Sequence, residues 1–318
     1  MSMATQQSLV LESKQGALII SQRPIPQPPN RRTSHKIDWK IQARGFLVES
    51  YPAVLGSDAA GDVEKVGEGV VGWEKGDKVF FQGFYRNERA TFQQYTTIPA
   101  DLVAKIPSKY TYSQAASIPV SLSCAIYGLY APKPLGLGLN PNIDSSVKQT
   151  GQPALVLGGS TSVGLYAIQL LRYMEFNPII AYASSKHFVY LKSLGATFIV
   201  DRVGRSSFSG NAEAQEAGMS CLVEGGELIT VNSTTKSDSD DGKIMLAVFG
   251  TVHLPHTRAF GKVLYERLPQ LIEQDVVVPA RVEDLPNGLQ GIVDGLQRLK
   301  RNEVSGVKLV GHPQEQSN

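Results

Sequence analysis

A glycine-rich stretch in the middle of the chain has the residue types and spacing to bind a phosphate group. Residues 155–164 read Leu-Val-Leu-Gly-Gly-Ser-Thr-Ser-Val-Gly, an apolar strand that runs through a glycine turn into a helix. Unpaired backbone N–H groups and the positive end of a helix meet at such a junction, and both attract an anion. Gly159 and Gly164 match the outer glycines of the G-x-G-x-x-G dinucleotide fingerprint, with Thr161 in the middle position. The stretch predicts a diphosphate-binding loop; a tight turn without a ligand is the alternative.

The residues after the next apolar segment indicate which dinucleotide would bind. NAD sites place an acidic residue there for the ribose 2′-hydroxyl, yet no acidic residue occurs between Glu175 and Asp201. Instead Ser184-Ser185-Lys186-His187 follows the segment, and two hydroxyls with a cation suit a 2′-phosphate. The sequence therefore predicts NADPH. A helix cap formed by Ser184 or Ser185 is compatible with that role.

An alternation of strands and helices must position these motifs, and the second half of the chain predicts one. Apolar runs predict strands at 154–157, 179–182 and 197–200, with helices at 163–173 and 187–194 between them. This βαβαβ order requires a parallel sheet with right-handed crossovers. Further strands are predicted at 227–231, 245–252 and 307–310, and further helices at 212–217, 260–273 and 289–300.

The first third of the chain predicts turn-rich β structure. A hairpin is expected from residues 8–11 and 18–21, and seven glycines between Gly56 and Gly83 alternate with short β-prone runs. The remaining elements predicted here are strands at 92–98 and 102–106, a helix that opens at residues 113–116, and a helix at 119–130.

Composition excludes several classes of function. The 318 residues are 42% hydrophobic and 19% charged, which suits one large or two ordinary globular domains. The 31 basic and 29 acidic residues form no long run of one sign, which argues against a nucleic-acid partner. No apolar stretch reaches the roughly 18 residues that span a bilayer, and the start of the chain lacks a signal-peptide core. We expect a cytoplasmic protein without membrane contact, either a monomer or a homodimer.

Several motifs together resemble the medium-chain dehydrogenases/reductases. The loop at 158–164 is similar to the zinc-independent, quinone-oxidoreductase-like branch of that family. Segments 38–40, 248–253 and 304–308 resemble fungal trans-acting enoyl reductases and related dehydrogenases of secondary-metabolite clusters. The likeness covers nearly the whole chain. The glycine motifs that carry the family signature are Gly56-Ser57-Asp58-Ala59-Ala60-Gly61, Val66-Gly67-Glu68-Gly69-Val70 and Gly76-Asp77-Lys78-Val79.

The resemblance implies an α/β fold of two domains. Residues 1–118 would form a GroES-like catalytic β domain and residues 119–274 an NADP-binding Rossmann domain with a doubly wound parallel sheet, while 275–318 return to the first domain. The pyrophosphate would lie at Gly159, Ser160, Thr161, Ser162 and Val163, and the adenosine phosphate at Ser184, Ser185, Lys186 and His187. The nicotinamide half would be lined by Asp38, Trp39, Lys40, Thr251, Val252, His253, Val304 and Ser305, and the substrate by Ser121, Leu122, Ser123, Cys124 and Ala125.

The motifs argue against a catalytic metal. Zinc-dependent relatives carry Gly-His-Glu where this chain has Gly56-Ser57-Asp58, and the upstream cysteine ligand is missing. A catalytic zinc needs three protein ligands, whereas the five histidines are scattered and Pro255 separates His253 from His256. We expect no bound metal and hydride transfer without one.

Two segments are shorter than the family pattern. Only eight residues lie between Pro29 and Asp38, where the family has a strand and its turn. Residues 201–225 have room for one brief helix, where the family has a helix and a strand. In the strand order 3-2-1-4-5-6 the missing strand is the fourth, beside the first at the ligand-binding switch point. Either another segment fills that position or the protein is compromised, and a faulty gene model would give the same pattern.

The expected reaction is reduction of an electron-poor C=C bond by hydride from the nicotinamide, followed by protonation of the neighbouring carbon. Lys40 and Tyr51 are the candidate catalytic residues. Lys40 would donate to the developing oxyanion or hold the cofactor, and Tyr51 would donate a proton; a solvated lysine and a packed turn tyrosine are the alternatives. The substrate is predicted to be a small-molecule or carrier-bound enone or enoyl group of polyketide type, with a polyketide synthase as a candidate partner in trans. A stand-alone quinone or enone reductase, and an impaired dinucleotide-binding pseudoenzyme, are the alternative functions.

Overall fold

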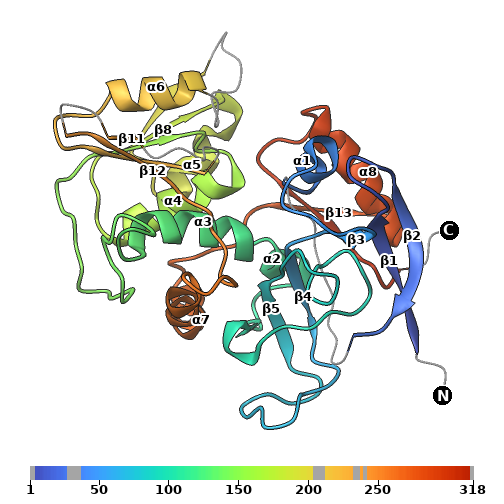
Figure 1. Ribbon diagram of the computed structural model, residues 1–318. Coiled ribbons are helices and arrows are strands. Elements are labelled where there is room, and N and C mark those ends of the chain that lie inside the picture. The colour runs from blue at the N-terminus through green and yellow to red at the C-terminus, as the bar shows by residue number, and fades with distance from the viewer. Residues whose placement is uncertain (1–3, 27–36, 203–211, 232–236, 239–241, 316–318) are drawn as a thin grey trace. The chain divides into compact units, whose positions relative to one another are not determined.

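The computed structural model describes residues 4–26, 37–202, 212–231, 237–238 and 242–315 (Figure 1). The chain divides into two compact units. The first unit contains Met1–Val120 and Pro279–Asn318, and the second contains Ser121–Val278. Most of the first shortened segment, between residues 29 and 38, lies outside the described residues, as does the 203–211 part of the second.

The first unit opens with the predicted hairpin. Strands β1 (Thr5–Leu11) and β2 (Leu18–Pro24) pair antiparallel with Leu11 opposite Leu18, and β3 (Ala53–Val54) pairs with the other side of β1. This confirms the hairpin, whose strands are longer than predicted. A second sheet has the order β4 (Asp58–Asp62), β5 (Lys78–Gln82) and β6 (Ala104–Lys105), all antiparallel.

The strand predicted at residues 92–98 is wrong. Gln93 forms a single antiparallel bridge with Ser8, and residues 95–99 have no regular secondary structure. The side chain of Gln93 donates to the backbone carbonyl of Asn87 at 2.6 Å, and Thr96 Oγ1 donates to that of Glu88 at 2.7 Å. These polar side chains satisfy backbone groups locally, which stabilises a turn in competition with a strand.

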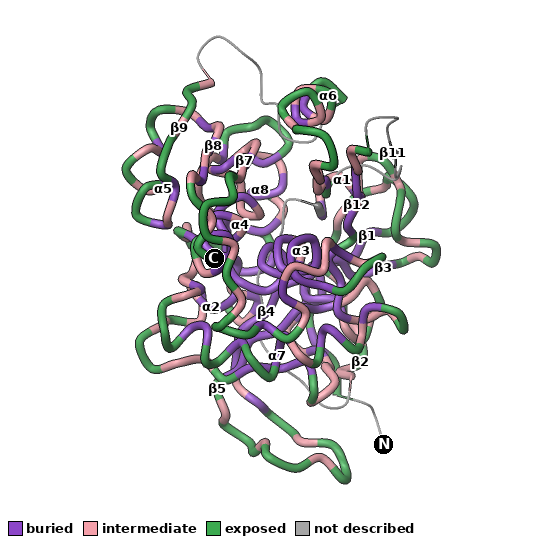
Figure 2. The backbone as a smooth tube through the Cα atoms, turned by 90° about the vertical axis from the view of Figure 1, so that its left-hand side faces the viewer, coloured by how far each residue is buried: buried purple, intermediate pink, exposed green. Residues whose placement is uncertain are grey.

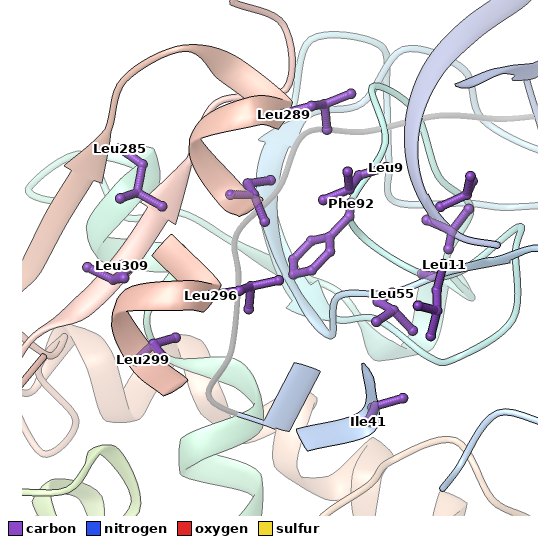
Figure 3. Close-up of a cluster of buried hydrophobic side chains, with 14 of the residues drawn as sticks. Leu9, Leu11, Ile41, Leu55, Phe92, Leu285, Leu289, Leu296, Leu299 and Leu309 are labelled. Atoms are coloured by element: carbon purple, nitrogen blue, oxygen red, sulfur yellow. The ribbon is translucent and has the colours of Figure 1, made fainter. Parts of the chain in front are cut away.

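Helices and a late strand pair complete the first unit. They are α1 (Ile37–Arg44), the 3₁₀ turn η1 (Ala100–Leu102), α2 (Tyr112–Ala116), α8 (Gly288–Lys300) and the parallel pair β13 (Val282–Leu285) and β14 (Lys308–Gly311). The sequence did not predict α1 or β13. A hydrophobic core joins β1, α1, α8 and the Phe92 turn, with Leu9, Ile41, Leu289 and Leu296 facing it (Figure 3). Because this core combines residues before 93 with residues after 284, the C-terminal segment is an integral part of the first unit.

Helix α3 (Pro119–Tyr130) has the predicted bounds and begins with proline, which suits the first helical position. It is buried along almost its entire length (Figure 2). No helix in the described part of the chain is both long and apolar enough to cross a bilayer.

The predicted βαβαβ alternation is confirmed in the second unit. Strands β7 (Ala154–Leu157), β8 (Ile179–Ala183) and β9 (Phe198–Asp201) form a parallel sheet in the order β7-β8-β9. Helix α4 (Ser162–Tyr173) connects the first two strands, and the turn η2 (Ser185–His187) with α5 (Phe188–Leu194) connects the last two. Apart from the turn η2, these bounds lie within a residue of the prediction; Pro153 and Gly158 border β7, and Pro178 and Ser184 border β8.

A second, separate sheet follows in this unit. It has the order β10 (Glu227–Thr230), β12 (Ile244–Ala247) and β11 (Ser237–Asp238); β10 is parallel to β12 and β11 is antiparallel to it. Helix α6 (Ala212–Ser220) contacts β10 of this sheet, and α7 (Arg258–Glu273) follows later in the chain and packs on Val252 and Tyr127. The strand predicted at 245–252 is wrong beyond Ala247. A Cβ at Gly250 would lie 2.4 Å from Cys124 Cα, so the chain leaves the sheet to pack tightly on α3.

The predicted gap in the sheet is present among the described residues. There, β7 pairs with β8 on one side and with no strand on the other, where the fourth strand of the expected order would lie. The side chain of Leu155 in β7 is 41% exposed. Helix α6 packs over both sheets, since a Cβ at Gly218 would lie 3.4 Å from Leu157 Cδ1 and 3.1 Å from Leu228 Cδ1. A helix therefore links the two sheets, and no described segment takes the place of the fourth strand.

Candidate functional site

The glycine loop between β7 and α4 is held against the end of β8. The backbone N–H groups of Gly158 and Gly159 both donate to the carbonyl of Tyr182, each at 3.1 Å. Thr161 is the N-cap of α4: its backbone is extended (φ −75°) and its Oγ1 accepts a hydrogen bond from Gly164 N at 3.1 Å. An extended backbone does not require glycine, and a threonine cap stabilises the helix start. This explains why threonine stands in the middle position of the fingerprint.

Gly164 packs closely against the glycine loop, and this packing brings the start of α4 to the loop where a diphosphate would bind. A Cβ there would lie 2.4 Å from the carbonyl oxygen of Gly158 and 2.9 Å from Gly159 Cα, so only glycine lets the helix begin directly against the loop. Residues 160–163 are half-buried. The first-turn N–H groups of Ser162 and Val163 have no acceptor within their own helix. The loop thus offers N–H donors at a positive helix end, which is the chemistry that a diphosphate needs.

The turn predicted to bind a 2′-phosphate lies at the same edge of the sheet as the loop. Leu157 and Tyr182 are partners in the β7–β8 register, so both strands end together. Ser185 and Lys186 are exposed and Ser184 is half-buried, whereas His187 is buried. The first three residues are therefore placed to meet a ligand from solvent, and His187 is placed to support the turn.

Two residues at this edge escaped the sequence reasoning. Asp201, the last residue of β9, accepts a hydrogen bond from Ser185 N at 3.2 Å, and Arg202 N donates to the carbonyl of Ala183 at 3.2 Å. A carboxylate and a cationic residue thus adjoin the turn from the neighbouring strand. The sequence could have indicated Asp201 and Arg202, because the third strand of a parallel sheet ends at the same edge as the second.

The predicted substrate and nicotinamide segments of the second unit lie against each other. Gly250, just before residues 251–253, packs on Cys124 of α3. Thr251 and Val252 are buried and His253 is half-buried, with His253 N donating to Thr251 Oγ1 at 3.3 Å. Within residues 121–125 the side chains are buried except that of Cys124, which is half-buried. Of that stretch, only Cys124 is therefore accessible in this unit.

In the first unit, the predicted residues of α1 have distinct environments. Asp38 is fully buried, and its Oδ1 accepts a hydrogen bond from Gly56 N at 3.0 Å, which fixes the turn before β4. Trp39 packs against the hydrophobic core. Lys40 is half-buried, and its burial together with the nearby charge of Arg44 lowers the pKa of its amine. Lys40 is the one member of this group whose environment favours release of a proton.

The remaining predicted residues of this unit surround the same core. Tyr51 packs against it, and its hydroxyl donates to the carbonyl of Val48 at 3.1 Å. Val304 is a buried core residue and Ser305 is half-buried. The structure thus places Trp39, Tyr51 and Val304 around one hydrophobic cluster. Their binding and catalytic roles remain predictions.

A buried ion pair joins Asp58 of β4 to Lys308 of β14. Lys308 Nζ donates to Asp58 Oδ2 and, at 3.4 Å, to the carbonyl of Ser117, while Asp58 Oδ1 accepts from Val120 N at 2.7 Å. Burial raises the pKa of the Asp58 carboxyl, and the Lys308 charge opposes that rise. Within the described ranges, no three His, Cys, Asp or Glu side chains gather as a metal site would require. Asp58 is instead positioned to join β4 to β14 and to the start of α3.

The chain is similar in sequence to known dehydrogenases and reductases. Residues 32–108 match the alcohol dehydrogenase GroES-like domain. The dehydrogenase pigH of Monascus ruber is 38% identical over 203 residues, which cover 58% of this chain and 54% of that protein. The dehydrogenase azaJ of Aspergillus niger is 28% identical, covering 97% and 99% of the two chains. The trans-enoyl reductase himH of Aspergillus japonicus is 28% identical, covering 86% and 84%.

Solved structures share the fold over the full length. An alcohol dehydrogenase superfamily protein from Novosphingobium aromaticivorans matches with a TM-score of 0.76 at 23% identity, covering 97% of this chain and 98% of that one. The quinone oxidoreductase from Coxiella burnetii matches with a TM-score of 0.73 at 19% identity, covering 96% and 99%. A mycobacterial protein complexed with NADPH matches with a TM-score of 0.74 at 20% identity, covering 96% and 99%.

The fold and these relationships make the chain similar to oxidoreductases of the medium-chain dehydrogenase/reductase type, with a GroES-like match over residues 32–108 and a Rossmann-type parallel sheet. Such enzymes use a nicotinamide dinucleotide. Among its relatives, this chain is similar to fungal proteins named dehydrogenase or trans-enoyl reductase. The alignment with the Aspergillus niger dehydrogenase runs over 349 positions, which exceeds the 318 residues of this chain. That relative therefore contains residues with no counterpart here.

Proposed function

We propose that this protein is an NADPH-dependent oxidoreductase that reduces an activated C=C bond in an enone or enoyl substrate of polyketide type. One observation carries the proposal: the glycine loop at 158–164 is hydrogen-bonded to the strand that ends in the Ser-Ser-Lys turn. The candidate diphosphate site and the candidate 2′-phosphate site thus lie at one sheet edge. The names of the relatives, trans-enoyl reductase and quinone oxidoreductase, and the NADPH complex of one structural neighbour support it.

Each group of residues has a proposed task. The N–H groups of residues 160–163 hold the diphosphate, and Ser184, Ser185 and Lys186 hold the 2′-phosphate. NADPH, when bound, supplies the hydride. Lys40 stabilises the developing enolate oxygen by donating a hydrogen bond or a proton, for which an amine with a lowered pKa is suited. Tyr51 is the weaker candidate, because its hydroxyl already donates to Val48.

The domain assignment follows from these tasks. We propose that the GroES-like unit carries catalysis, that the second unit binds the dinucleotide, and that the substrate is a small enone or a carrier-bound chain supplied by a polyketide synthase in trans. The alternative of an impaired, dinucleotide-binding pseudoenzyme is favoured by one observation, the β7 edge that has no partner strand in the described residues. A stand-alone quinone or enone reductase is the third candidate.

Turnover on a substrate panel separates these functions. The purified protein should oxidise NADPH, followed by the loss of nicotinamide absorbance, in the presence of enoyl thioesters, and more slowly with free enones and quinones. Faster reaction with quinones would favour the stand-alone reductase. NADPH binding without oxidation across the whole panel would favour the pseudoenzyme.

Lys186 should determine the preference for NADPH over NADH. Lys186→Ala removes an exposed cation beside the candidate 2′-phosphate site, so the Kd for NADPH should rise about tenfold while that for NADH stays unchanged. The matched control is Lys148→Ala, a lysine of the same unit that pairs with Glu175, before the start of β8. Fluorescence titration measures both constants. Equal weakening of both nucleotides would contradict the assignment of Lys186 to the 2′-phosphate.

We expect the rate of the reaction to fall at alkaline pH, where Lys40 loses its proton. A donor must be protonated, and because burial and Arg44 lower the pKa of Lys40, the rate should fall with rising pH below the usual lysine range. Arg44→Gln removes the like charge, so the fall in rate should occur at higher pH. Lys40→Arg should remove the pH dependence over this range. The measurement is kcat/KM against pH for the three proteins. An unchanged profile in Lys40→Arg would exclude Lys40 as the titrating donor.

A further inference from the structure

One buried hydroxyl in the first unit has no hydrogen-bond partner in the part of the chain that the structure describes. It belongs to Ser57, which lies in the turn before β4 and is 2% exposed. A buried hydroxyl without a partner destabilises the folded state, so a native protein that retains one needs a reason for it. None of the tasks proposed for the other residues uses Ser57.

Hydrogen bonds hold the backbone of this turn in place. Gly56 N donates to Asp38 Oδ1 at 3.0 Å, and Thr91 N donates to the carbonyl of Gly56 at 3.0 Å. Gly83 N donates to the carbonyl of Ser57 itself at 2.9 Å. A Cβ at Gly56 would lie 2.4 Å from Thr91 Oγ1, and the φ of +91° also favours glycine there. Because serine has three staggered rotamers, its hydroxyl can turn to a ligand while this backbone stays fixed.

The same turn is joined to the helix that carries Lys40. Asp38, which accepts the N–H of Gly56, lies in the first turn of α1, two residues before Lys40. The Ser57 hydroxyl, next to this hydrogen bond, and the half-buried amine of Lys40 are both able to donate. An enolate oxygen accepts more than one hydrogen bond, and donors that are fixed before the reaction stabilise it most. Two donors on joined elements of the first unit therefore suit one developing oxyanion.

We propose that Ser57 donates a hydrogen bond to the carbonyl oxygen of the enone or enoyl substrate, as a second donor beside Lys40. This inference rests on the proposed function and adds a residue to it. The hydrogen bond strengthens as negative charge develops on that oxygen during hydride addition. Ser57 keeps its own proton throughout, so it stabilises the oxyanion and takes no part in proton transfer.

The kinetics of Ser57→Ala with NADPH and an enoyl thioester test this inference. Both kcat and kcat/KM should fall about 10- to 100-fold, because a hydrogen bond to a charged oxygen is lost in the transition state. The Kd for NADPH should stay within about twofold of the wild-type value. The fall in rate at alkaline pH should stay where it is, because Lys40 remains the titrating donor. The melting temperature should be unchanged or higher, because the variant removes an unpaired polar group and breaks no hydrogen bond of the described residues.

Ser117→Ala is the matched control. Ser117 is also a buried serine of the first unit, but its Oγ donates to the carbonyl of Gln114 at 2.7 Å and accepts from Ala280 N at 3.1 Å. Its removal leaves a buried N–H group without this acceptor. The control should therefore lower the melting temperature by about 3–10 °C and leave kcat unchanged.

Two results would overturn the inference and leave the proposed function intact. One is a folded Ser57→Ala protein that turns over the enoyl thioester as fast as the wild type. The other is a melting temperature as low as that of Ser117→Ala, or failure of Ser57→Ala to fold, which would make the hydroxyl a structural group. A wild-type protein that reduces no enone or enoyl thioester would instead refute the proposed function.

Discussion

Gly164→Ala should weaken NADPH binding by about 10- to 100-fold. The new methyl group would lie 2.4 Å from the Gly158 carbonyl oxygen and 2.9 Å from Gly159 Cα, both backbone atoms that cannot rotate away. The loop or the start of α4 must therefore shift, and overpacking of this kind costs about 1–3 kcal/mol, with 1.4 kcal/mol equal to a factor of ten in Kd. Fluorescence titration of Trp39 and Trp73 with NADPH measures the effect.

A matched glycine serves as the control. A Cβ at Gly67 would meet only Val70 Cγ2, at 3.8 Å, so Gly67→Ala should leave NADPH affinity unchanged. Thermal unfolding of both variants distinguishes a local change in the loop from a loss of the fold. If a folded Gly164→Ala protein bound NADPH as the wild type does, the loop at 158–164 would not be the diphosphate site.

Lys308→Met should lower the free energy of unfolding of the first unit by about 3–5 kcal/mol, because removing one partner leaves the other charge buried without compensation. Both side chains are almost completely buried, and Asp58 also accepts the N–H of Val120 at the start of α3. Denaturant unfolding measures the loss. The double variant Asp58→Asn/Lys308→Met keeps an oxygen for Val120 and removes the charge, so it should be more stable than the single variant.

The stability lost in Lys308→Met should depend on pH. Burial raises the pKa of Asp58 in the folded state, and without Lys308 nothing of opposite charge limits that rise. A raised carboxyl pKa contributes stability at low pH that is lost as the pH rises through it. The difference in the free energy of unfolding between wild type and Lys308→Met should therefore narrow as the pH falls. A difference that widened as the pH falls would show that Asp58 is not the group left uncompensated.

The elements formed by neighbouring residues could be predicted from the sequence. The strands and helices between 154 and 201 follow from apolar runs bordered by glycine, proline and serine, and α3 follows from its continuous small and apolar residues. Helix α1 was missed because Asp38-Trp39-Lys40 interrupts any apolar stripe, and its burial depends on packing against α8. Aromatic and threonine residues at 92–98 favour a strand, but the side chains of Gln93 and Thr96 donate to backbone carbonyls of the preceding segment instead.

The residues missed at the site depend on contacts between distant parts of the chain. Asp58 and Lys308 are 250 positions apart, and nothing local marks either as half of a buried pair. Asp201 and Arg202 became relevant only once the third strand was placed beside the second. The gap beside β7, in contrast, was predicted by counting residues against the strand order, because a missing strand is a matter of chain length.

Calorimetric titration of the unmodified protein with NADPH and with NADH tests the central claim most directly. We expect saturable binding of one NADPH per chain, with NADH at least about tenfold weaker because it lacks the 2′-phosphate that Ser184, Ser185 and Lys186 are proposed to hold. Absence of heat with either nucleotide, or tighter binding of NADH, would contradict it.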